Sequence, residues 1–140
     1  MKKLISILFF FFVLILFGSC RNKTVVLLTK KWDCVQVDNI VPPDTKSLTA
    51  TDSFNLEKLN LTLQSMSLTF KNNMRYEFAI RDDVTVQGKY ELLDDDRIII
   101  LTRQAVNTST RYIIKSLTPD ELVLTGNAEN TNVVLHFKPH

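Results

Sequence analysis

The sequence predicts an all-β fold, an eight-stranded antiparallel up-and-down β-barrel with a short helix or lid between the first two strands. Three observations support this prediction. Val, Ile and Thr together supply 32 of residues 20–140, and β-branched residues favour strands. Apolar and polar side chains alternate with a period of two in one segment after another. Short turns join most of these segments, and consecutive hairpins produce an up-and-down strand order.

The first nineteen residues differ from the rest, and we expect residues 1–19 to be a signal peptide. Lys2-Lys3 gives a positive start, and an apolar run broken only by Ser6 then extends from Leu4 to Phe17. This run of 14 residues is too short for a stable transmembrane helix, which needs about 20. A charged start, a short apolar run and small residues before a cleavage point are typical of an export signal.

Two small residues, Gly18-Ser19, stand directly before Cys20. This arrangement resembles the lipobox of bacterial lipoproteins. The resemblance implies that Cys20 is lipidated, becomes the new N-terminus and attaches the protein to a membrane. No acidic residue follows directly in Arg21-Asn22-Lys23, which by analogy with other bacterial lipoproteins favours the outer membrane of the cell envelope. Residues 20–30 are then expected to be a lipid-anchored tether.

The predicted strands follow from alternation, and the turns between them from turn-forming residues. Asn72-Asn73 is expected to form a tight hairpin because Asn tolerates positive φ. Acidic turns are expected at Arg81-Asp82-Asp83 and at Asp94-Asp95-Asp96. The expected strands are Trp32–Asp38, Ser67–Phe70, Arg75–Ile80, Thr85–Leu92, Arg97–Arg103, Arg111–Leu117, Glu121–Thr125 and Asn132–Lys138.

The segment from Ile40 to Met66 is the exception to the alternating pattern. Pro42-Pro43 ends the first strand, because proline cannot donate to a strand ladder. Asp52 or Ser53 could cap a helix. One face of that helix would carry Leu56, Leu59, Leu63 and Met66. The leucines around position 61 also alternate as in a strand, and we expect a short helix or lid here, with a second short helix over Val25 to Thr29.

Closure of eight strands into a barrel removes the exposed edges that invite aggregation. The segments that carry a family pattern are Lys31-Trp32, Leu68-Thr69-Phe70, Gly88–Leu92, Arg97–Ile100 and Leu117–Leu122. In this order and spacing they resemble the bacterial lipocalin-like domain lipoproteins, over about residues 24–138. The resemblance implies a lipocalin-like β-barrel domain at residues 31–140. It also implies that a late basic residue, here Lys138, covers Trp32.

The composition argues against several functions. Without Lys2 and Lys3 the chain holds 15 basic and 15 acidic side chains, whereas a nucleic-acid binder needs a basic field. We therefore expect no nucleic-acid partner. No group of residues suggests catalysis, so we expect no enzyme, no cofactor and no metal site. His136 is expected to point outward, and Cys34 to be a small buried hydrophobe.

The side chains that alternation places inside the barrel are the candidate ligand-binding residues. They are Trp32, Phe70, Tyr76, Phe78, Tyr90, Ile100, Tyr112, Leu124 and Phe137. In one interpretation they pack as a solid core, and the filled barrel acts as a protein-interaction or inhibitor module. In the other they line a cavity that binds a small hydrophobic or amphipathic molecule. Three inward tyrosines favour the cavity, because a buried hydroxyl needs a hydrogen-bond partner.

Overall fold

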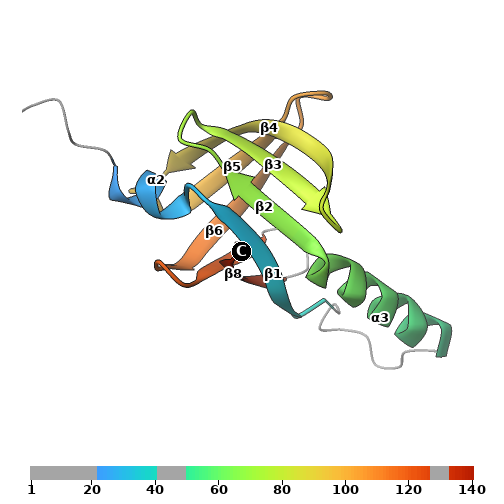
Figure 1. Cartoon of the computed structure of the whole chain (residues 1–140). Coiled ribbons are helices and arrows are strands. Elements are labelled where there is room, and N and C mark those ends of the chain that lie inside the picture. Colours follow the sequence, from blue (N-terminus) through green and yellow to red (C-terminus); the bar gives the residue numbers. More distant parts are fainter. Residues whose placement is uncertain (1–21, 41–49, 127–132) are drawn as a thin grey trace, which may run out of the picture.

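The computed structural model of the chain describes residues 22–40, 50–126 and 133–140. Residues 1–19, Cys20 and Pro42-Pro43 therefore lie outside the described residues. Eight antiparallel strands follow one another around a closed barrel, and the last strand pairs with the first (Figure 1). The predicted fold class is confirmed.

The barrel strands agree closely with the predicted ones. They are β1 (Lys31–Asp38), β2 (Met66–Phe70), β3 (Arg75–Ile80), β4 (Asp83–Leu93), β5 (Ile98–Arg103), β6 (Ser109–Leu117), β7 (Leu122–Gly126) and β8 (Val134–Pro139). Helix α2 (Lys23–Leu28) precedes β1, and helix α3 (Ala50–Gln64) connects β1 to β2. The two helices lie at opposite ends of the barrel (Figure 1).

The helix between β1 and β2 differs in detail from the expected one. It begins at Ala50, so Asp52 and Ser53 lie inside it rather than at its N-cap. Met66 belongs to β2, where it pairs with Ile80, and not to the helix face. The leucines of this segment fit both helical and strand spacing, so the sequence alone did not fix where the helix ends and β2 begins. The pairing of β2 with β3 sets this boundary.

The end of the barrel beside α2 is filled with large side chains, and we call it the filled half. Its fully buried residues are Trp32, Tyr90, Phe70, Phe137, Leu28, Ile99, Leu122 and Leu124. Phe70 and Tyr90 meet edge to face with ring centroids 5.2 Å apart, a favourable aromatic geometry. Leu28 shows that part of the predicted tether is folded into the core.

Trp32 joins α2 to the barrel. Its indole Nε1 donates a hydrogen bond of 2.9 Å to the carbonyl oxygen of Leu28. The ammonium of Lys30 lies 5.0 Å from the centroid of the Trp32 ring, within the range of a cation–π contact. Lys138, the cation expected there, is exposed and pairs across the strands with Asp33.

The face assigned to Ile100 is wrong. Ile99 and Leu101 are the buried residues of β5. Ile100 stands opposite Glu91 on one neighbouring strand and opposite Arg111 on the other, so it lies on the outer face. The cause is the run of four apolar residues from Ile98 to Leu101, which has no alternation from which a face can be assigned.

The expected β2–β3 hairpin is present, but its left-handed residue is not an asparagine. Met74 adopts φ 61°. Its amide donates to the carbonyl oxygen of Lys71, and the Lys71 amide donates to that of Arg75. A turn followed by one left-handed residue is a common three-residue hairpin loop. The acidic turns do use positive φ, at Arg81, Asp82 and all three residues of 94–96.

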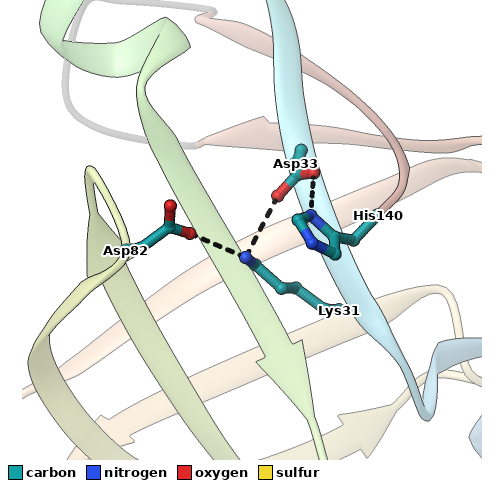
Figure 2. A network of polar contacts seen from close by, with 4 residues as sticks. All are labelled: Lys31, Asp33, Asp82 and His140. Atoms are coloured by element: carbon teal, nitrogen blue, oxygen red, sulfur yellow. Dashed lines mark hydrogen bonds and ion pairs between the residues drawn. The ribbon is translucent and has the colours of Figure 1, made fainter.

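A polar network crosses the outer face of β2 (Figure 2). The Lys31 ammonium lies 2.8 Å from an Asp82 carboxylate oxygen and 3.9 Å from one of Asp33, which also contacts His140 Nδ1 at 2.7 Å. The hydrogen bond from Lys31 lowers the pKa of Asp82. This contribution to stability is therefore present above the ordinary carboxyl pKa and is lost as pH falls through the lowered value. Solvent screening keeps it small.

The expectation that Cys34 is a small buried hydrophobe is confirmed. Its side chain belongs to the core and is 4% exposed. Burial raises the pKa of the thiol to about 11, although a backbone hydrogen bond of Gln36 opposes the rise. The thiol is therefore protonated at neutral pH, and only the thiolate is a good nucleophile.

Candidate ligand-binding site

A cavity of about 580 Å³ occupies the half of the barrel on the α3 side. This volume lies within the range of about 300–1,000 Å³ that is typical of small-molecule sites. Its wall is mainly apolar, with contributions from Leu63, Met66, Leu68, Phe78, Val86, Leu101, Val133 and Leu135. The barrel is therefore solid at one end and hollow at the other.

Two tyrosines line the cavity, and each stands opposite a glycine of the next strand. Tyr76 on β3 pairs with Gly88 on β4, and Tyr112 on β6 pairs with Gly126 on β7. A Cβ at Gly88 would lie 2.7 Å from Tyr76 Cε1, and one at Gly126 would lie 3.5 Å from Tyr112 Cε1. Each ring therefore leans over its glycine. A side chain at position 88 would prevent this arrangement, whereas 3.5 Å at position 126 is an ordinary contact distance.

Arg103 completes the polar part of the cavity. Its position on β5 pairs with the other side of Gly88. Residues two apart on a strand face the same side, so Arg103 shares the inward face of Leu101. The side chain lines the cavity and is partly open to solvent. Tyr76, Gly88 and Arg103 thus form one row across three strands.

The electrostatics of the two tyrosines show that Arg103 acts on both. Burial raises the pKa of Tyr76 and of Tyr112 above the usual 10.0, and the positive charge of Arg103 opposes the rise in each case. Both phenols therefore remain protonated at neutral pH. A protonated phenol can donate a hydrogen bond, so these three residues offer two neutral donors and one cationic donor. Ser109 and Thr110 add hydroxyls to the same lining.

Among the side chains that the structure describes, the two tyrosine hydroxyls and the Arg103 guanidinium have no partner. The hydroxyl of Tyr90, in the filled half, donates to the carbonyl oxygen of Lys71 at 3.1 Å. Within residues 22–40, 50–126 and 133–140, neither the Tyr76 hydroxyl nor the Tyr112 hydroxyl forms a hydrogen bond, and no carboxylate forms an ion pair with Arg103. The two hydroxyls and the guanidinium are therefore available to a molecule in the cavity.

The candidate residues divide into three groups. Tyr76, Phe78 and Tyr112 line the cavity. Trp32, Phe70, Tyr90, Leu124 and Phe137 belong to the core of the filled half. Ile100 lies on the outer face. Both interpretations of the interior therefore describe part of the barrel.

Arg103 is the main residue that the sequence prediction missed. Taking Leu101 as inward would have placed Arg103 two residues further along the same face. Arginine is seldom buried. From the sequence alone, Arg103 is therefore interpreted as the exposed end of the strand and not as a cavity residue.

Other polar groups offer no further site. Nε2 of His136 lies 2.9 Å from a carboxylate oxygen of Asp38 and is partly exposed. Among the residues that the structure describes, no three His, Cys, Asp or Glu side chains gather as metal ligands would. No helix in the described ranges is long and apolar enough to cross a membrane.

No family model matches the chain, and no curated protein matches it. The solved structures that are similar to this chain include two from Bacteroides. A lipocalin-like protein from Bacteroides uniformis has 15% sequence identity and a TM-score of 0.53, and the match covers 81% of this chain and 99% of that one. A DUF4847 family protein from Bacteroides vulgatus has 12% identity and a TM-score of 0.52, with 81% and 94% covered. At these identities the likeness shows the fold alone: the chain has a lipocalin-like barrel.

Proposed function

We propose that this protein is a lipoprotein of the bacterial cell envelope that binds a small hydrophobic or amphipathic molecule and has no catalytic role. The observation that carries the proposal is the cavity of about 580 Å³ with a mainly apolar wall and three polar groups that have no partner among the described side chains. An apolar pocket with a few convergent polar groups is the usual form of a small-molecule site. A barrel that acts only through its surface has no need of this hollow.

The attachment to the membrane rests on Cys20. The side chain of Asn22 caps α2 by accepting a hydrogen bond of 2.9 Å from the Thr24 amide. Two residues span at most about 7 Å, so a lipid on Cys20 would hold α2 close to the membrane. Since α2 and α3 lie at opposite ends of the barrel (Figure 1), the cavity end would face away from the outer membrane. Ligand would then enter from the aqueous side.

A substitution that fills the cavity tests the binding proposal. Val86 lines the cavity, so Val86→Trp is expected to weaken binding of dodecanoate or dodecanol at least about tenfold, because the indole occupies their space. Val84 on the same strand is 51% exposed, and Val84→Trp is the matched control that should leave affinity unchanged. Isothermal titration calorimetry is the suitable measurement, because Trp32 lies in the filled half and does not report on the cavity. Absence of binding of both molecules to the unmodified protein would refute the proposal.

The lipid anchor is tested separately in bacterial cells that carry the full chain. The protein is expected to incorporate labelled palmitate and to partition into detergent, whereas Cys20→Ser should do neither, because the lipidated sulfur is missing. Cys34→Ser is the control, because its thiol is buried and protonated. Equal labelling of the Cys20→Ser chain would contradict the anchor while leaving the binding proposal intact.

A further inference from the structure

We infer that the cavity recognises a single-chain amphiphile with one carboxylate head group, held by Arg103 together with the hydroxyls of Tyr76 and Tyr112. This inference rests on the proposed function, because it names the class of molecule that the same cavity binds. It is carried by the charge of the lining, by the position of its donors and by the apolar wall beneath them.

The charge of the lining favours an anion. Among the described residues that line the cavity, two are cationic, Arg103 and Arg111, and none is acidic. Arg111 stands opposite Ile100 on the outer face, so its charge faces away from the lumen. Arg103 is then the cation that faces inward. Its single positive charge is balanced by a ligand that carries one negative charge.

The donors suit a carboxylate. A guanidinium presents parallel N–H groups that match two carboxylate oxygens. The protonated hydroxyls of Tyr76 and Tyr112 can donate to the remaining lone pairs. Both rings are oriented by the glycines opposite them, which fixes where the hydroxyls stand. A neutral head group would forgo the charge-assisted hydrogen bonds that a carboxylate makes with the guanidinium.

The position of these groups also orients the molecule. Arg103 is exposed and ends β5, whereas Leu101, two residues earlier on the same face, is 5% exposed. The head group therefore lies at the open side of the cavity. The chain extends inward from there past Leu101, between the apolar side chains of the wall.

Calorimetric titration with three twelve-carbon probes tests the inference: dodecanoate, dodecanol and dodecyltrimethylammonium. The unmodified protein should bind dodecanoate at least about tenfold more tightly than the other two, because a charge-assisted hydrogen bond stabilises by about 1.5–3 kcal/mol. In Arg103→Gln this preference should disappear, while dodecanol affinity changes less than about threefold. Arg97→Gln, which removes an arginine paired with Asp94 outside the cavity, should retain the full preference.

The hydroxyls are tested by Tyr76→Phe and Tyr112→Phe, each expected to weaken dodecanoate about two- to tenfold and dodecanol little. Equal affinity for dodecanoate and dodecanol, or a preference that survives Arg103→Gln, overturns the head-group assignment while the proposed function stands. If none of the three probes binds, the proposed function itself fails. Matching circular dichroism spectra and melting temperatures for all variants exclude misfolding as the cause of a loss.

Discussion

Trp32→Ala is expected to lower the free energy of unfolding by about 3–5 kcal/mol, the usual cost of removing a large buried aromatic side chain. Trp32 is fully buried and is the largest side chain of the filled half. Its loss leaves a cavity that the surrounding strands can close only in part. It also removes the hydrogen bond to the Leu28 carbonyl, so α2 should separate from the barrel before the barrel itself unfolds.

Denaturant unfolding followed by far-ultraviolet circular dichroism measures this loss, and hydrogen exchange at residues 25–29 reports on α2. Trp32→Phe is the informative control: it keeps an aromatic ring but not the indole donor. It should cost less than Trp32→Ala and yet accelerate exchange in α2, because the Leu28 carbonyl oxygen loses the indole donor and keeps only the Lys30 amide. Unfolding energies within about 1 kcal/mol for Trp32→Ala and the unmodified protein would show that the filled half does not hold the fold together.

The alternation of apolar and polar residues predicted the barrel, because side chains along a strand point to the same face at every second residue and one face of each strand is dry. Tyr76 and Phe78 in β3 illustrate this, since they alternate with Arg75 and Glu77, which mark the wet face. The same rule failed at Ile98–Leu101, where four apolar residues in succession hide the face. There, pairing with Glu91 and Arg111 determines which side chains point outward.

The candidate site was only partly predictable because alternation says which face is inward but not how far along the barrel a residue lies. Trp32 and Tyr112 share the inward face, yet one belongs to the filled half and the other to the cavity. The position of each residue along the barrel axis depends on the stagger between neighbouring strands, and this stagger is set by pairing between residues far apart in sequence. The missing residue, Arg103, needed that stagger as well, because only its pairing with Gly88 places it beside Tyr76.

Gly88→Ala is expected to destabilise the protein by about 3 kcal/mol or more, at or above the upper end of the usual overpacking cost. A Cβ at this position would lie 2.0 Å from the Thr102 carbonyl oxygen. That atom belongs to the backbone of β5, so it cannot rotate away as the end of a side chain could. The methyl group would have to separate β4 from β5 or push Tyr76 from its place over the glycine.

Gly126→Ala is the matched control, since it too places a methyl group beneath a tyrosine of the cavity. Here the nearest atom is Tyr112 Cε1 at 3.5 Å, an ordinary contact distance. The substitution should be neutral or stabilise by about 0.5–1 kcal/mol, because alanine loses less backbone entropy on folding than glycine. Chemical denaturation of both variants measures the contrast. Equal stability of the two variants would mean that the strands around Gly88 are further apart than the barrel register requires.

Because Tyr76 leans on Gly88, Gly88→Ala should also weaken dodecanoate binding where the chain still folds.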